Sequence, residues 1–586
     1  MSLNHLWKIT LLGVMFALLG CNAKPPSLPL TDAVMQNKTP EVKLHIKAGT
    51  DVNQPIEDGS TPLMIASARG NTEIIKLLLQ AGANVNAANV EGNTALMLAS
   101  YLGRTHVIEP LLQAGASINT SNKMGYTPLL LAMQEKHYDI AKLLISKGAD
   151  VNVKTIDGNT ALVYACGNGD IDTTKMLLER HANPNIFTKI GVSPLMLACQ
   201  NGNIEIVNLL LAAGANVNLS GSEGFSPLML ASQYGHAEIV KILLNKGADV
   251  SAVSKQGATA LILASSGGHL NIVKLLLAAK ANVNSVEKYG RTSLMLASTN
   301  GHPEVAKVLL AARANPHLRD IHGKTALFFA SLNGQTEIVK LLLQAHAQPN
   351  VAAEKGTTPL MAASDEGYLL IVKQLLAAKA NVNATNNEGL TALMLASRGG
   401  YAPIVNLLLS AKANVNTQNG KRRTALFFAS ANGKTEVVQR LLAAGAQKTI
   451  NIQDTEEGRT PLIWASKDGY AGVVSLLLHA QANPNIQDVL GNTALIYASE
   501  HGYTDIVKML ITARANVNIA NEYGETALML ASEHGHADIV KILLVAHANP
   551  NVISTHVAYR KTPLLMAQNN GHDEIVALLR AAGAKR

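Results

Sequence analysis

Histidine is the residue type whose spacing in this sequence comes closest to that of a metal site. His534 and His536 form an H-x-H pair, and His501 stands 33 residues before His534. Zinc–nitrogen bonds are about 2 Å long, whereas packed neighbouring helices lie about 8–10 Å apart. Residues on neighbouring helices are therefore badly placed to share one ion. We expect no bound metal and no other cofactor.

Motifs that carry catalysis are missing from the sequence. It has no G-x-x-x-x-G-K-[ST] phosphate loop, no G-x-S-x-G nucleophile turn and no H-E-x-x-H zinc helix. We expect no enzymatic activity. Five histidines follow a glycine at one recurring position, which favours a structural role for them: His236, His269, His302, His536 and His572.

Two cysteines, Cys166 and Cys199, are 33 residues apart at equivalent positions of a repeated segment. A disulfide needs Cα atoms within about 7 Å, which is closer than neighbouring helices usually approach. We expect both to be buried free thiols that replace the serine found there in other copies.

The third cysteine, Cys21, ends an apolar leader. Lys8 precedes twelve apolar residues at 9–20, too few to cross a hydrocarbon core of about 30 Å as a helix. A short apolar run after a positive charge is typical of a signal peptide, here residues 1–20. The junction Leu18-Leu19-Gly20-Cys21 resembles the lipobox of bacterial lipoproteins. That resemblance implies that Cys21 becomes the acylated first residue of the mature protein.

Residues 21–27 would then be a lipidated cysteine and a short tether, in which Pro25 and Pro26 favour an extended chain. This predicts an exported envelope lipoprotein that faces the periplasm or the cell surface and contacts the membrane through its anchor. A plain secretory leader with a chance cysteine is the alternative.

Charge and composition argue against nucleic-acid binding and against disorder. The chain of 586 residues is 48% hydrophobic, 15% charged and 4% aromatic, and its net charge of +8 is a mild excess for this length. The tight basic run Lys421-Arg422-Arg423 has no aromatic partners of the kind that stack on bases.

A Thr or Ser followed by P-L or A-L, or by S-L at Thr292, recurs along the chain. Twelve copies follow one another at steps of 33 residues, and four more follow with two steps of 36. With a partial copy at the start, this gives about seventeen units over residues 28–586. The opening residues are Thr61, Thr94, Thr127, Thr160, Ser193, Ser226, Thr259, Thr292, Thr325, Thr358, Thr391, Thr424, Thr460, Thr493, Thr526 and Thr562. The extra residues of the long steps are expected in the connecting turns near Glu456 and Tyr559.

The 33-residue unit of T-P-L, a short helix, Gly, a second helix and G-A-x-V-N resembles the ankyrin repeat. The resemblance implies an all-α repeat solenoid of helix-turn-helix units with short hairpin fingers, and a protein-binding role. Each unit also looks like a packing module in its own right. The leucine at position 63 and the alanine at position 66 have identical counterparts in all sixteen copies. In the second helix of one copy, residues 337–345, a single helical stripe holds Ile338, Val339, Leu342 and Leu343, and Leu341 widens it.

Two positions depart from the family pattern. Methionine replaces the family's histidine after T-P-L in eight copies, which favours apolar packing there over a redox-sensitive surface: Met64, Met97, Met196, Met229, Met295, Met361, Met394 and Met529. At the end of the second helix, nine copies replace the usual glycine, at His181, Lys280, Arg313, His346, Lys379, Lys412, Gln481, Arg514 and His547. We expect a left-handed backbone at these nine residues.

Five of these residues come from successive repeats and would form a basic ridge: Lys280, Arg313, His346, Lys379 and Lys412. They either complement the negative ends of their helices or bind an anion.

The residues that vary between copies lie just before each opening Thr and after each A-S or A-C pair. The resemblance implies that they form the concave binding face. Seven of them are aromatic and are candidate partner contacts: Tyr101, Tyr126, Phe225, Tyr234, Tyr289, Tyr523 and Tyr559. We expect a monomeric protein-binding scaffold of the bacterial envelope. The alternatives are a secreted effector or toxin-neutralising binder, and a binder of anionic lipid or polysaccharide through the basic ridge.

Overall fold

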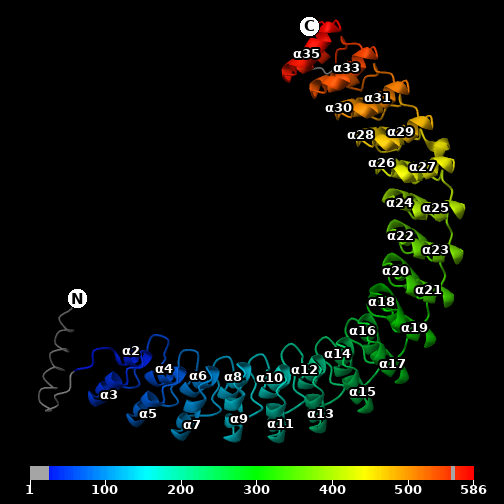
Figure 1. Ribbon diagram of the computed structural model, residues 1–586. Coiled ribbons are helices and arrows are strands. Elements are labelled where there is room, and N and C mark those ends of the chain that lie inside the picture. The colour runs from blue at the N-terminus through cyan, green and yellow to red at the C-terminus, as the bar shows by residue number, and fades with distance from the viewer. Residues whose placement is uncertain (1–24, 556–560, 586) are drawn as a thin grey trace. The chain divides into compact units, whose positions relative to one another are not determined.

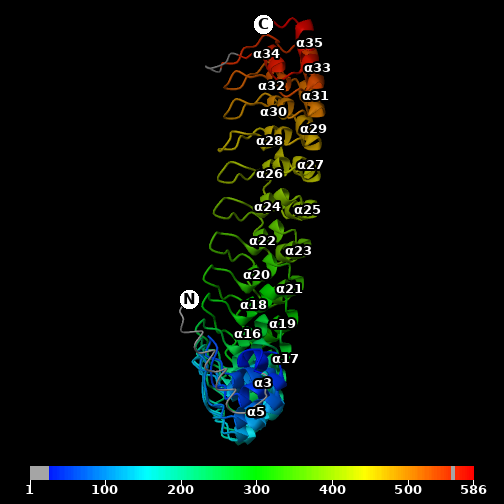
Figure 2. The same cartoon turned by 90° about the vertical axis from the view of Figure 1, so that its left-hand side faces the viewer.

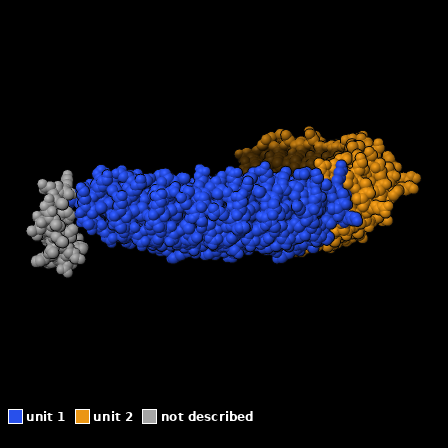
Figure 3. All heavy atoms as spheres, turned by 90° about the horizontal axis from the view of Figure 1, so that it is seen from below, with its two compact units in different colours: residues 1–264, 274–281 blue, residues 265–273, 282–586 orange. Residues whose placement is uncertain are grey.

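The computed structural model describes residues 25–555 and 561–585, which form two compact units (Figure 3). Unit 1 comprises residues 1–264 and 274–281, and unit 2 comprises residues 265–273 and 282–586. The expected signal peptide, Cys21 and Tyr559 lie outside the described residues.

Helices account for the regular structure of the described residues, in which no strand forms and only two isolated bridges occur. The thirty-four α-helices of the described residues follow one another as seventeen pairs, which confirms the predicted all-α array of about seventeen repeats. Helix α2 (Leu30–Met35) and helix α3 (Thr39–Lys47) form the partial first repeat.

The first helices of the other repeats are α4 (Pro62–Arg69), α6 (Ala95–Tyr101), α8 (Pro128–Gln134), α10 (Ala161–Asn168), α12 (Pro194–Asn201), α14 (Pro227–Gln233), α16 (Ala260–Ser266), α18 (Ser293–Asn300), α20 (Ala326–Leu332), α22 (Pro359–Asp365), α24 (Ala392–Gly399), α26 (Ala425–Ala431), α28 (Pro461–Lys467), α30 (Ala494–Glu500), α32 (Ala527–Glu533) and α34 (Pro563–Asn569).

The second helices are α5 (Thr72–Gln80), α7 (Thr105–Gln113), α9 (Tyr138–Ser146), α11 (Ile171–Glu179), α13 (Ile204–Ala212), α15 (Ala237–Asn245), α17 (Leu270–Ala278), α19 (Pro303–Ala311), α21 (Thr336–Gln344), α23 (Leu369–Ala377), α25 (Ala402–Ser410), α27 (Thr435–Ala443), α29 (Ala471–His479), α31 (Thr504–Thr512), α33 (Ala537–Val545) and α35 (Asp573–Ala581). Within each of the two compact units, the first helices of neighbouring repeats pack against one another, and so do the second helices (Figure 1). In unit 2 the first helices line the inner side of the curve.

An opening Thr or Ser caps the first helix of its repeat, with the exception of Thr526, whose hydroxyl makes no hydrogen bond in the described structure. Thr61 accepts a hydrogen bond from the Met64 backbone N–H through its hydroxyl, and Pro62 occupies the first helical turn. The sulfur of Met64 lies 3.5 Å from the Thr61 backbone nitrogen, close enough to act as a weak acceptor. Met64 is also buried, as are its equivalents, so the prediction of apolar packing for these methionines is confirmed.

Small and branched apolar residues fill the space between helices. Ala66 and its equivalents are fully buried, which leaves no volume for a larger side chain where first helices meet. On α21, Ile338, Val339 and Leu342 are buried, but Leu343 is only half-buried. The buried stripe of this second helix is therefore narrower than the sequence predicted.

Cys166 and Cys199 are free and fully buried, as expected. Burial raises the pKa of the Cys166 thiol to about 12, and burial also raises the pKa of Cys199. The equivalent Ser67 and Ser232 hydroxyls have no hydrogen-bond partner in the described structure. Cysteine fits this position because it acts as a small apolar residue.

Histidines brace successive repeats. His236 donates a hydrogen bond from Nε2 to the Gln200 carbonyl at 3.0 Å, and His536 makes the same bond to the Glu500 carbonyl. His302 and His572 repeat the arrangement. These rings pack over the glycines that end the preceding first helices, where a Cβ would collide with the ring. The structural role that the sequence predicted for these four histidines is confirmed.

An asparagine in each A-N-x-N turn links its repeat to the next one. Asn383 donates from Nδ2 to the Lys412 carbonyl at 3.3 Å and accepts at Oδ1 from the Asn414 N–H at 2.8 Å. The same pair of bonds is made by Asn53, Asn86, Asn152, Asn185, Asn218, Asn350, Asn518 and Asn551. His317 occupies this position in its repeat, and its exposed ring makes no hydrogen bond within the described residues.

The three extra residues of the first 36-residue step do not all lie in the turn near Glu456, as the sequence had predicted. Asn451 follows Gly445 by six residues, whereas Asn416 follows Lys412 by four. Two of the three extra residues therefore lie before Asn451, where the 3₁₀ helix η1 (Ala446–Thr449) accommodates them, and one lies in the hairpin that holds Glu456. A tight 3₁₀ turn absorbs residues without moving the asparagine link. The extra residues of the second long step fall between Asn551 and Thr562, and residues 556–560 of this segment lie outside the described residues.

We predict that Asn383→Ala weakens its repeat junction, whereas His317→Ala does not. The alanine at 383 leaves the Lys412 carbonyl and the Asn414 N–H without their partner, at a cost of about 1–3 kcal/mol in the free energy of unfolding. Urea unfolding and hydrogen exchange of the Asn414 amide measure the effect. Equal destabilisation by both substitutions would contradict the linking role of the asparagine.

Candidate protein-interaction surfaces

The hairpins between repeats form the first candidate surface. Most hairpin tips donate a backbone hydrogen bond to the preceding hairpin, as Ile156 N does to Met124 O at 3.0 Å in unit 1 and Ile321 N does to Tyr289 O at 3.0 Å in unit 2. Figure 2 shows successive hairpins of unit 2 projecting in parallel from the first helices. The tips of neighbouring hairpins within a unit therefore form a continuous edge.

The predicted aromatic contacts lie at three different places. Tyr101 and Tyr234 stand exposed at the ends of α6 and α14, whereas Tyr126 and Phe225 are half-buried at the bases of hairpins in unit 1. The Tyr126 hydroxyl lies 3.3 Å from that of Tyr164. Tyr289 and Tyr523 are exposed at hairpin tips of unit 2. The structure does not gather these residues into one patch.

Sequence reasoning missed a cluster on the inner side of unit 2, which we name the inner-face cluster: Arg423, Phe427, Arg459, Trp464, Lys467 and Tyr497. At its centre, the Arg459 guanidinium lies 4.8 Å and the Lys467 ammonium 5.3 Å from the Trp464 ring centroid. The Phe427 and Trp464 rings meet edge to face at 6.3 Å. Helices α26, α28 and α30 supply the aromatic rings. A signal was present, because Trp464 and Tyr497 both stand four residues after an opening Thr.

The two arginines of the cluster are already neutralised. Arg459 is buried, with Nε 3.2 Å from Asp488, and its Nη2 donates to the Tyr497 hydroxyl at 2.9 Å. Burial, followed by the hydrogen bond to Asp488, raises the pKa of Tyr497.

Arg423 pairs with Asp454 at 2.6 Å and with Glu456 at 2.7 Å. Lys421 also holds Glu456, and its hydrogen bond lowers the pKa of that carboxyl group.

Lys467 differs from these arginines. No carboxylate of the described residues lies within ion-pair distance of its ammonium, and its side chain is half-buried beside Trp464. A half-buried cation that no internal acid neutralises is suited to an acidic group of a binding partner.

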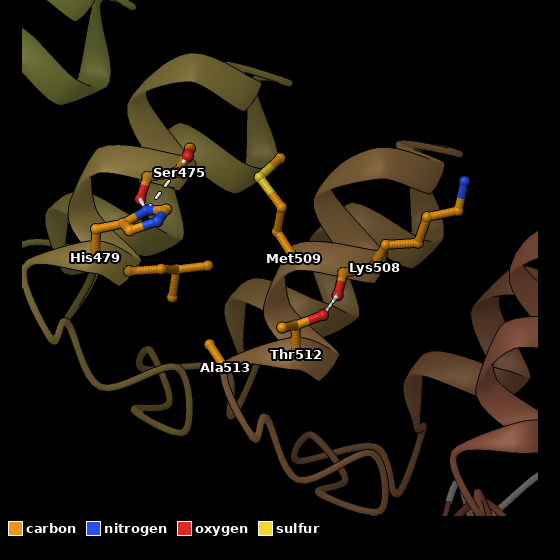
Figure 4. A pocket seen from close by; sticks show the side chains of 7 residues that line it. Ser475, His479, Lys508, Met509, Thr512 and Ala513 are labelled. Carbon is orange, nitrogen blue, oxygen red and sulfur yellow. Dashed lines mark hydrogen bonds between the residues drawn. The ribbon is translucent and has the colours of Figure 1, made fainter.

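A cleft of about 300 Å³ opens on the other side of the same repeats, between α29 and α31 (Figure 4). His479 donates from Nδ1 to the Ser475 carbonyl at 2.7 Å, and Thr512 donates to the Lys508 carbonyl at 2.8 Å. These polar groups bond their own helices, and Leu478, Met509 and Ala513 complete a mainly apolar lining. The cleft lacks convergent polar groups that would define a ligand site.

All nine residues that replace glycine at the ends of second helices have the predicted left-handed backbone, with φ between 60° and 66°. Of the basic ridge, Arg313, His346, Lys379 and Lys412 belong to unit 2 and Lys280 to unit 1. Their side chains are exposed, and none forms an ion pair within the described residues.

His501, His534 and His536 do not converge. His501 and His534 each bond a carbonyl of their own helix through Nδ1, and His536 braces the preceding repeat. Across residues 25–555 and 561–585, no three His, Cys, Asp or Glu side chains meet in a group that could hold a metal ion. No helix in this part of the chain has the length and apolar character needed to cross a membrane.

A family model described as ankyrin repeats (3 copies) matches the chain in twelve overlapping segments that together run from residue 30 to residue 585. The individual segments are residues 30–122, 111–188, 153–221, 188–254, 228–320, 280–353, 310–386, 327–419, 369–452, 393–488, 476–554 and 513–585. Comparison with curated proteins gives no significant match.

We predict that glycine at Arg313, Lys379 and Lys412 together leaves the stability of the array unchanged or raises it, by at most about 1 kcal/mol per site. Glycine relieves left-handed strain, while the lost cation–dipole attraction offsets part of that gain. Denaturant midpoints measure the change. Lys373→Gly inside α23 is the control and should lower stability. A marked loss in the triple variant would show that these side chains make stabilising contacts.

Proposed function

The chain belongs to the ankyrin-repeat family, and on this basis we propose that it is a protein-binding scaffold of a bacterial envelope. Ankyrin repeats generally mediate contacts between proteins. The partner would bind across the hairpins and the first helices, where side chains differ between repeats while the interior stays constant.

Trp464 and Lys467 carry this proposal. Tryptophan is among the residues that contribute most to protein interfaces, because a large ring buries much area with few rotatable bonds. Trp464 stands on α28, a first helix of unit 2, and its half-buried ring packs between Arg459 and Lys467, while its Nε1 atom is buried. Lys467 adds a cation without an internal counter-charge. Together they favour a partner that presents an acidic group beside an apolar contact for the ring.

We predict that Trp464→Ala and Lys467→Glu each reduce capture of the partner from envelope extracts by at least roughly tenfold. The bait is the full chain, and quantitative mass spectrometry measures the captured proteins. The outer-face variant His479→Ala, in the same repeat, should capture them like wild type. Loss of capture in the outer-face variant alone would place the partner on the opposite side of the array.

Export and anchoring form the second part of the proposal. The apolar run at 9–20 and the Leu-Leu-Gly-Cys junction support a lipoprotein signal with Cys21 as the acylated residue. The eight residues after Cys21, residues 22–29, would span at most about 28 Å when extended and would keep the first repeats close to the bilayer. The partner would then be a protein met in the periplasm or at the cell surface.

We predict that Cys21→Ser moves the protein from the membrane fraction to the soluble fraction, because the variant lacks the thiol that carries the lipid. Fractionation and labelling with radioactive palmitate measure this. Retention of the variant in membranes, together with no label in the wild type, would contradict the anchor.

Anionic ligands are a second candidate, favoured by the exposed and unpaired cations of the basic ridge. Salt-sensitive binding of the chain to vesicles with anionic lipid would support it, and the triple glycine variant should then bind more weakly with a smaller dependence on salt.

A further inference from the structure

Four successive hairpin tips of unit 1 expose large apolar side chains. Val90, Met124, Ile156 and Ile190 are 54%, 49%, 57% and 76% exposed. A single exposed apolar residue is ordinary on a protein surface, but a contiguous row of them usually marks an interaction site. Their exposure becomes visible only in the folded hairpins, because the sequence itself points to aromatic and charged side chains as contacts.

The row is continuous because the tips are bonded to one another. Lys123 N donates to Glu91 O at 3.1 Å, Ile156 N to Met124 O at 3.0 Å, and Lys189 N to Asp157 O at 2.7 Å. Each tip is a turn of four residues closed by a glycine, as Gly92 N closes on Asn89 O. The two central residues of each turn therefore form two parallel columns along the edge.

The charges in these columns are separated by sign. The first column holds Val90, Lys123, Ile156 and Lys189, and the second holds Glu91, Met124, Asp157 and Ile190. The apolar residues thus run in a zigzag, with lysines on one side and acids on the other. We name these eight residues the tip edge. None of its four charges forms an ion pair within the described residues.

We propose that the tip edge binds an amphipathic α-helix of a protein partner, whose apolar stripe has acidic residues on one flank and basic residues on the other. This inference rests on the protein-binding function proposed above. Helix and edge match in spacing, because seven helical residues rise about 10.5 Å and packed repeats lie about 10 Å apart.

Other occupants fit less well. An extended strand covers about 10 Å in three residues, but residues three apart on a strand point to opposite faces, so it could fill only every second tip. A membrane with anionic lipid would meet Glu91 and Asp157 as well as the lysines. A helix with one charge on both flanks would leave one column of the tip edge facing like charges.

A stapled synthetic helix of four heptads tests the proposal, with Leu at each a position, Ala at each d, Glu at each e and Lys at each g. Fluorescence anisotropy would measure its affinity for the full chain. We expect binding that is at least roughly tenfold weaker in the double variant Met124→Asp/Ile156→Asp, because two apolar contacts are lost. Val253→Asp changes an equally exposed residue of unit 1 outside the tip edge and should bind like wild type. Thermal melting checks that all variants fold.

A second helix with Glu on both flanks should bind more weakly than the first. The proposal is overturned if the first helix does not bind, if the double variant binds it unchanged, or if both helices bind equally. The experiments distinguish failure of the tip-edge proposal from failure of the proposed protein-binding function. If capture of the envelope partner depends on Trp464 while the helix does not bind, the protein-binding function stands and the tip edge has another role.

Discussion

The asparagine link between repeats is the interaction that sets the position of most hairpins in the array relative to their neighbours. Asn350 holds the Lys379 carbonyl through Nδ2 and the Asn381 N–H through Oδ1, so one side chain sets the backbone on both sides of the left-handed turn. Each net hydrogen bond contributes about 0.5–1.5 kcal/mol, which is comparable to the cost of a left-handed residue with a side chain. Cations can therefore replace glycine at these turns without displacing the next hairpin.

The fold could be predicted from the sequence because its period is a global property. A 33-residue spacing with constant Leu and Ala requires every unit to pack in the same way, so the helix starts, the left-handed residues and the buried methionines all followed. The placement of the extra residues, by contrast, depended on local geometry. Three extra residues have no preferred place in a periodic pattern, and two of them entered η1 because this turn lengthens without breaking the asparagine link.

The candidate sites were harder to predict because exposure and charge balance depend on neighbouring repeats. Arg459 and Lys467 look alike in the sequence, yet Arg459 lies between Asp488 and Tyr497 while Lys467 keeps its charge unmatched. The Asp488 carboxylate that pairs with Arg459 comes from the next repeat along the chain, so inspection of one repeat at a time does not reveal which cation is neutralised. The tip residues raise the same difficulty. Met124 and Ile156 become neighbours through a backbone bond between hairpins that no residue pattern indicates.

Independent repeats allow one chain to hold two dissimilar surfaces. A constant interior of Ala and Leu carries the stacking, so a substitution at a tip or on an inner face disturbs only the adjoining repeats. The tip edge is apolar with separated charges, whereas the inner-face cluster is aromatic and leaves one cation unmatched. They lie in different units and use different helices and hairpins. A partner with an amphipathic helix and a partner with an acidic segment would therefore contact different residues. Either surface can change in evolution without altering the packing that holds the repeats together.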